Sequence, residues 1–205
     1  MALADFADLK DSIASWLARV ADTEITSNAA DFVALAEAYF NRKLRVRQME
    51  TVSTFTTTDG STNLSDDYLA WKRLTWLGDT YVALEYVSPD MLVRMHPAVE
   101  AGTPSVFTIE NNDIIVRPTD DDTEFSFLYY AKVPALEDDT DTNWVLNEYP
   151  DLYLAASLAE ANAFLINPDH SNLWAQKRDM IIDDITKLSE KTKGPSAIRP
   201  IGTWY

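Results

Sequence analysis

Apolar residues recur at steps of three and four near both ends of the chain and at steps of two in its middle. Steps of three and four place apolar side chains on one face of a helix, whereas steps of two place them on one face of a strand. The pattern therefore predicts helices over residues 3–20, about 28–45 and 150–165, and a last helix that follows Asp169.

The middle of the chain predicts about six short strands. β-Branched and aromatic residues alternate over residues 52–57, and two further runs, 68–77 and 81–87, flank Gly78-Asp79 as in a β-hairpin. Three more strands are expected over residues 106–109, 114–116 and 125–130, and a short helix around residues 91–95. No repeat of 20–50 residues is visible.

The helix over residues 150–165 is apolar on nearly every side. Asn147 can cap it, Pro150 suits its first turn, and Asp151 places a negative charge at the positive end of the helix dipole. Only a narrow strip of Ser157, Glu160 and Asn162 is polar. Such a helix must be covered on more than one side, either by its own fold or by a neighbouring subunit.

The other helices are amphipathic, so their apolar residues predict which side chains are buried. The first two helices should form an antiparallel pair, because the joint between them is short. The last helix, with Asp169 as a possible cap, should pack against the helix over residues 150–165. The residues expected to face inward are Phe32, Leu35, Tyr39, Phe40 and Leu44 in the second helix and Leu173, Trp174, Met180, Ile181, Ile185 and Leu188 in the last.

This order of elements predicts an α+β fold, in which a helical bundle of two N-terminal and two C-terminal helices carries an inserted antiparallel β lobe. Residues 1–48 are expected to form the N-terminal helical pair, residues 49–135 the β-rich lobe, and residues 136–192 the C-terminal helical pair. Residues 193–205 are expected to be an extended C-terminal arm.

The C-terminal arm has no helical period, yet apolar residues stand between its prolines. A merely flexible tail is expected to be polar, so these residues favour an arm that becomes ordered on a partner. Packing against its own domain is the alternative. The residues expected to make the contact are Lys193, Pro195, Ile198, Arg199, Pro200, Ile201, Trp204 and Tyr205.

Four cations, Arg42, Lys43, Arg45 and Arg47, crowd the end of the second helix in a chain with 33 acidic and 17 basic residues and a net charge of -16. They suit the negative helix terminus and surface ion pairs. A functional alternative is contact with an acidic neighbour in an assembly. Nucleic-acid binding is a third hypothesis, which the acidic charge of the whole chain disfavours.

The sequence contains no recognisable catalytic, cofactor-binding or metal-binding motif. The acidic runs at residues 120–122 and 137–141 lack calcium-loop spacing, and His96 and His170 stand beside turns. No Cys is present, and neither a signal peptide nor a membrane span is expected, so the protein should be soluble. A carboxylate-dependent peptidoglycan hydrolase stays open as an alternative function, because it needs only two acids.

Three stretches carry a resemblance to a known family. They are FVALAEAYFNRKLRVRQME over residues 32–50, the element formed by Gly102, Pro104, Phe107 and Ile109, and a third stretch in three parts: YYAKVPAL (129–136), TNWVL (142–146) and PDLYLAASLAEA (150–161). These motifs resemble the head-to-tail adaptor, or connector, proteins of the neck of podovirus-type tailed bacteriophages.

The resemblance implies a structural virion protein that is not an enzyme. Its copies would form a dodecameric ring that joins the portal protein to a tail nozzle or tail hub protein, and the C-terminal arm would reach the portal. The ring would form part of the DNA exit channel, through which DNA passes without specific binding. Arg42, Arg45, Arg47 and Trp144 are the residues expected to touch a neighbouring subunit or partner.

Overall fold

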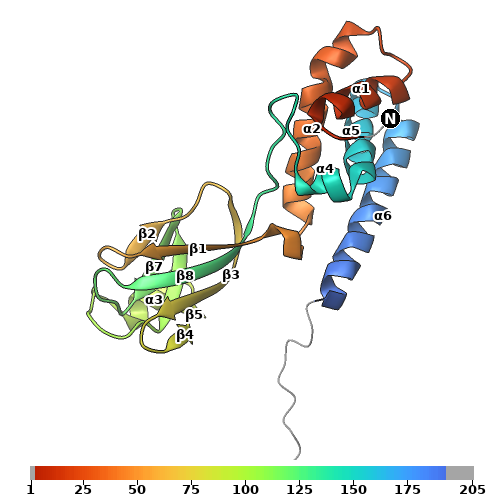
Figure 1. Ribbon diagram of the computed structural model, residues 1–205. Coiled ribbons are helices and arrows are strands. Elements are labelled where there is room, and N and C mark those ends of the chain that lie inside the picture. Colours follow the sequence, from red (N-terminus) through yellow and green to blue (C-terminus); the bar gives the residue numbers. More distant parts are fainter. Residues whose placement is uncertain (1–2, 193–205) are drawn as a thin grey trace, which may run out of the picture. The chain divides into compact units, whose positions relative to one another are not determined.

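The computed structural model describes residues 3–192, which divide into two compact units. Residues up to Gln48 and from Val133 onward form a helical unit, and Met49–Lys132 form a β unit. Figure 1 shows the helices and strands of both. The predicted α+β class is confirmed.

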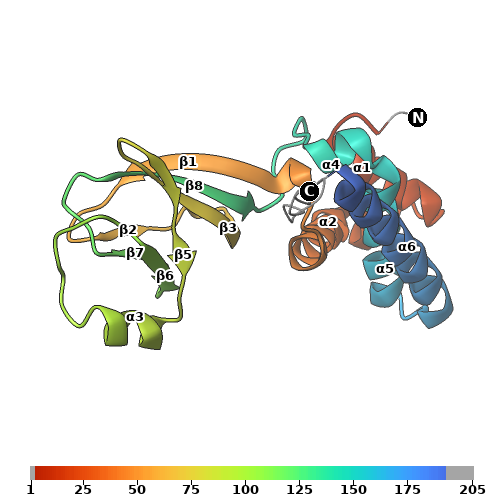
Figure 2. The same cartoon turned by 90° about the horizontal axis from the view of Figure 1, so that it is seen from below.

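The helical unit is built around α5. Its helices are α1 (Phe6–Trp16), α2 (Thr23–Lys43), α4 (Trp144–Glu148), α5 (Pro150–Phe164) and α6 (Pro168–Thr192). The short 3-10 helix η1 (Arg47–Met49) follows α2 and spans the point where the chain passes into the β unit. Helix α5 packs against α1, α2, α4 and α6, as the absence of a polar face predicted. Figures 1 and 2 both show α5 and α6 side by side. The edge of the Tyr153 ring meets Phe40 of α2 at 5.1 Å in the core.

Several predicted helix boundaries are wrong. Helix α1 ends at Trp16, and Ala18 has a positive φ of 54°, so the chain leaves the helix before the expected end at residue 20. Helix α2 begins at Thr23 rather than Asn28, because the Asp22 side chain accepts a hydrogen bond from Glu24 N and caps it. Asn147 does not cap α5, which has no side-chain cap. Asn143 instead caps the separate short helix α4.

Helix α6 buries a narrower stripe than its sequence predicted. Ile182 and Ile185 are buried, whereas the exposed fractions of Leu173, Met180 and Leu188 are 61%, 68% and 56%. Leu35 of α2 is also exposed. The reason is that α6 is covered mainly by α5, so apolar residues on its flanks reach the surface. The expectation that Leu35, Leu173, Met180 and Leu188 are buried was therefore wrong.

The β unit consists of two four-stranded sheets. One has the order β1-β8-β3-β4, with β1 at Glu50–Thr56, β3 at Tyr68–Leu77, β4 at Tyr81–Ala83 and β8 at Glu124–Ala131. The other has the order β2-β7-β6-β5, with β2 at Ser61–Asn63, β5 at Glu85–Tyr86, β6 at Val106–Glu110 and β7 at Asp113–Arg117. Aromatic and aliphatic side chains of both sheets, including Phe107, Phe125 and Phe127, form the core.

The β unit is not purely antiparallel. Strands β3 and β4 form the predicted hairpin, but β5 pairs with β6 in parallel. Parallel neighbours need a long connection, and the segment that contains α3 (Pro89–Met95) supplies it. The predicted run 81–87 is split into β4 and β5, which belong to different sheets.

Candidate partner-binding surface

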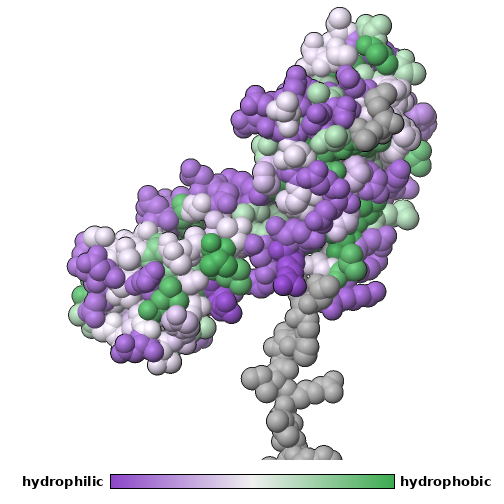
Figure 3. Space-filling model, viewed as in Figure 1, coloured by the Kyte–Doolittle hydropathy of each residue, from purple (hydrophilic) through white to green (hydrophobic). Residues whose placement is uncertain are grey.

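The helical unit contains an open groove along the C-terminal half of α6. Two adjoining hollows of about 400 and 240 Å³ share Tyr149, Ile185 and Leu188 as walls. The larger hollow is completed by Arg47, Gln48 and Ser189, and the smaller by Asp151, Ile181 and Asp184. We call this feature the α6 groove. Figure 3 shows hydrophobic surface among hydrophilic side chains alongside this part of the helical unit.

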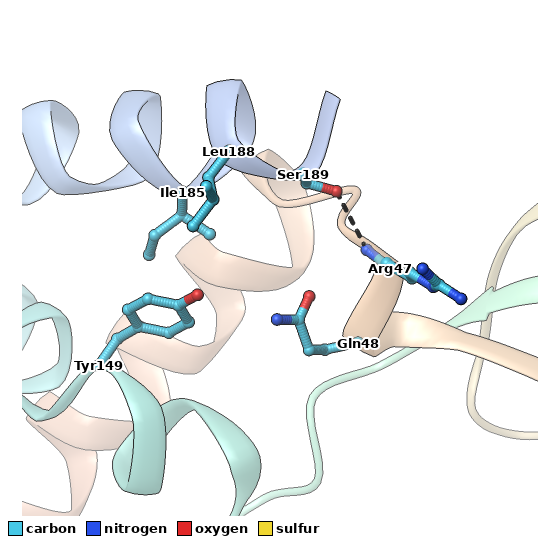
Figure 4. A pocket seen from close by; sticks show the side chains of 6 residues that line it. All are labelled: Arg47, Gln48, Tyr149, Ile185, Leu188 and Ser189. Atoms are coloured by element: carbon cyan, nitrogen blue, oxygen red, sulfur yellow. Dashed lines mark hydrogen bonds between the residues drawn. The ribbon is translucent and has the colours of Figure 1, made fainter. Parts of the chain in front are cut away.

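Hydrogen bonds hold the rim of the α6 groove in place. The backbone N–H of Arg47 donates to Ser189 Oγ at 3.3 Å, and Gln48 Nε2 donates to Glu148 Oε2 at 3.1 Å. Figure 4 shows Tyr149, Gln48 and Leu188 directed into the larger hollow, while the Arg47 guanidinium points away from it. The walls are mainly apolar and the groove is open, which suits an elongated ligand with apolar side chains.

The four cations near the end of α2, Arg42, Lys43, Arg45 and Arg47, make different contacts. Arg45 Nη1 donates to the carbonyl oxygens of Asn41 and Leu44, so it supplies a hydrogen-bond donor to carbonyl groups at the end of the helix. Arg42 and Lys43 lie near the ring of Tyr39, at 5.6 and 6.0 Å from its centroid, and both are exposed. Within residues 3–192, none of the four, Arg47 included, forms an ion pair with a carboxylate.

Tyr39 also joins α2 to α6. Arg178 of α6 is buried and stacks on the Tyr39 ring at 3.6 Å from its centroid. The Tyr39 hydroxyl donates to Asp179 Oδ1 at 2.8 Å, and Arg178 Nε donates to the same oxygen at 3.0 Å. This contact fixes the basic end of α2 against α6 and leaves Arg42 and Lys43 at the surface.

A buried polar network anchors residues 133–143, through which the chain re-enters the helical unit. Glu37 Oε1 accepts hydrogen bonds from Leu136 N and from the Tyr153 hydroxyl, both at 3.0 Å. Asn143 Nδ2 donates to the Tyr153 oxygen at 2.6 Å and to the Pro134 carbonyl at 2.7 Å. Nearby, Asn41 Oδ1 accepts from Val133 N at 2.9 Å.

Burial shifts the protonation of this network. Burial raises the pKa of the Glu37 carboxyl above its ordinary value of 4.5. Burial, together with the nearby Glu37 carboxylate, also raises the pKa of the Tyr153 phenol, which therefore stays a neutral donor. The network holds the backbone of the re-entering segment, and it has no opening toward a ligand, because Glu37, Asn143 and Tyr153 are all buried.

A comparison with protein families decides the identity. The model of the SU10 adaptor protein family matches residues 4–200, which is almost the whole chain. The chain belongs to the SU10 adaptor family. The resemblance to phage head-to-tail adaptors is thereby confirmed, and the protein is a structural component of phage virions. No curated protein matches the chain.

Two of the three stretches that carried the resemblance to this adaptor family contribute to the buried network. Glu37 and Asn41 come from the motif over residues 32–50, Asn143 from TNWVL, and Tyr153 from PDLYL. Sequence reasoning did not predict these contacts, because Glu37 and Tyr153 are far apart in sequence. A partial signal existed, however, since Glu37 is a charged residue within the otherwise apolar run FVALAEAYF over residues 32–40.

The predicted contact residues of this SU10 adaptor fall in different places. Arg47 lines the α6 groove, and Trp144 lies beside it, with its half-buried ring edge-on to Tyr149 at 6.4 Å. Arg42 lies at the surface, whereas Arg45 is engaged by backbone carbonyls. The arm residues Lys193, Pro195, Ile198, Arg199, Pro200, Ile201, Trp204 and Tyr205 lie outside the described residues.

Within residues 3–192 the structure contains neither a metal site nor a membrane-spanning helix. No group of three or more His, Asp or Glu side chains in this range could hold a metal ion. No helix there is both long enough and apolar enough to cross a lipid bilayer. His96, at the C-terminal end of α3, is half-buried, and its Nδ1 lies 3.9 Å from an oxygen of the exposed Glu100 carboxylate.

Proposed function

We propose that this adaptor forms a closed dodecameric ring that joins the portal protein to the tail nozzle or hub protein and surrounds part of the DNA exit channel. The observation that carries the proposal is the match to the SU10 adaptor family over residues 4–200. A structural role of this kind needs interfaces with like copies and with two further proteins, and no covalent chemistry.

Exposed apolar side chains support the existence of such interfaces. In the helical unit Trp16, Ile166 and Met180 are exposed by 60%, 88% and 68%. In the β unit, α3 buries Leu92 but exposes Met91, Val93 and Met95. Exposed large apolar side chains that gather on a surface are typical of protein interfaces, and Met adapts well to different partners.

The charges support the proposed passage of DNA. A net charge of -16 repels the phosphate backbone, so DNA can slide past the ring without being held. Arg42 and Arg47 are exposed and have no carboxylate partner within residues 3–192, which suits them to an acidic surface on a neighbouring copy or on the portal.

The C-terminal arm is the element that we assign to the portal. Its test is a variant in which Ile198, Ile201 and Trp204 are all replaced by Ser, compared with native protein in sedimentation with purified portal. We expect the variant to keep the native circular dichroism spectrum and to remain in the supernatant while native protein sediments with the portal. A matched control replaces the exposed Leu173 by Ser. Normal co-sedimentation of the triple variant would show that the arm does not bind the portal.

A further inference from the structure

The α6 groove has a regular arrangement of apolar walls. Ile181, Ile185 and Leu188 lie on one flank of α6, and Tyr149 faces them. Leu188 and Ile181 are seven residues apart, which is about 10 Å along a helix. Asp184 stands between them and is exposed. The groove therefore offers two apolar contact points with a negative charge between them.

The sequence that follows α6 has a matching pattern. Pro195, Ile198, Ile201 and Trp204 recur at steps of three, and Arg199 stands between the two isoleucines. A polyproline II segment has three residues per turn, so these side chains would share one side, with Ile198 and Ile201 about 9 Å apart. That separation is close to the spacing of the two apolar contact points in the groove.

We propose that residues 195–201 bind in the α6 groove of their own chain, antiparallel to α6, while the protomer is free of partners. Gly194-Pro195 would make the reversal, Ile198 would contact Leu188 and Ile185, and Ile201 would contact Ile181. Arg199 would then lie beside Asp184, which gives the pair opposite charges. Aromatic-lined grooves that accept proline-containing segments are a common mode of peptide recognition.

The short connection favours the same chain over a second copy. Leu188 lies only four residues before Thr192, about 6 Å along α6. Residues 193–198 can extend by at most about 20 Å, which is enough to turn back to Leu188. A tether this short raises the local concentration of the segment far above that of a free copy. The proposal goes beyond the adaptor role, because the docking takes place without portal or tail proteins.

Disulfide trapping in the full-length chain tests this docking, since the native sequence has no Cys. The test variant is Leu188→Cys with Ile198→Cys. The control is Glu190→Cys with Ile198→Cys, because Glu190 is exposed and lies about 160° around the helix from Leu188. Glu190 is also nearer to Ile198 in sequence, so an undocked segment would react with it at least as readily.

Under mild oxidation of dilute protein we expect an intramolecular disulfide in the test variant at about ten times the initial rate of the control. Adding Ile201→Ser to the test variant should lower that rate toward the control. Equal rates in test and control, or no effect of Ile201→Ser, would overturn the docking. Disulfide-linked dimers as the main product of the test variant would show that the segment binds a second copy instead. Because no portal is present, none of these outcomes depends on the proposed function.

Discussion

At the scale of single residues, the buried Glu37 is the feature with the clearest physical consequence. Its Oε1 accepts from Leu136 N and from Tyr153, and burial raises the pKa of its carboxyl. The folded protein therefore holds a proton on Glu37 more tightly than the unfolded chain does. Its contribution to stability is fully present below the unfolded pKa, near 4.5, and is lost as the pH rises through the raised folded pKa.

Glu37→Gln should remove this pH dependence, because an amide keeps the acceptor oxygen but does not ionise in this range. We expect the free energy of unfolding of native protein to fall relative to that of Glu37→Gln as the pH rises above 4.5. Urea unfolding of both proteins at several pH values measures the difference. A difference that stays constant with pH, or that grows in favour of the native protein, would contradict the burial of a charged Glu37.

Glu37→Ala serves as the companion variant. It leaves the Leu136 N–H and the Tyr153 hydroxyl without their acceptor and should cost about 2–4 kcal/mol of unfolding free energy. Gln at the same site should cost much less.

Hydrogen bonds between residues that are distant in sequence were the feature of the structure that the sequence predicted least. The acceptor role of Glu37 depends on Leu136 and Tyr153, which reach it only after the whole β unit has been inserted between them. Local patterns carry no information on such pairs. The sequence shows that Arg45 is charged, but its hydrogen bonds to the Asn41 and Leu44 carbonyls depend on how the chain leaves α2.

At the scale of elements, periodicity predicted most helices and strands but not which flank of each is covered. Helix α5, apolar on nearly all sides, is central as expected. Helix α6 has the apolar content of a buried helix, yet Leu173, Met180 and Leu188 are exposed. The parallel pairing of β5 with β6 was not predictable either, because a strand of two residues gives no periodic signal.

Two neighbouring substitutions on α6 test the observed burial. Ile185→Ala should lower the free energy of unfolding by about 2–4 kcal/mol, because its side chain is 5% exposed and its loss leaves a cavity. Leu188→Ala should cost less than about 1 kcal/mol, since the side chain is 56% exposed. Urea unfolding measures both. Equal losses would mean that Leu188 is buried as the sequence first suggested.

At the scale of the whole molecule, net charge and exposed apolar surface act together. The charge of -16 disfavours nonspecific binding to nucleic acid, and exposed apolar side chains are typical of surfaces that contact other proteins. The sequence alone predicted the negative net charge and an excess of apolar helix surface. It could not predict which apolar side chains are exposed, because their exposure depends on the packing of α6 and α3.

DNA binding is the whole-molecule alternative, and it is open to direct test. We expect no retention of the protein on duplex DNA at about 0.15 M salt, because the net charge opposes binding to phosphate. Filter binding or electrophoretic shift measures this. Retention that disappears in a variant with Arg42, Arg45 and Arg47 changed to Gln would instead assign the basic end of α2 to DNA.

The central claim is that copies of this adaptor surround one axis at the portal. Electron microscopy of purified protein mixed with purified portal tests it most directly. We predict closed rings of adaptor on one end of the portal, with one adaptor for each portal subunit. Portal particles that stay bare while the folded adaptor remains monomeric beside them would contradict the account.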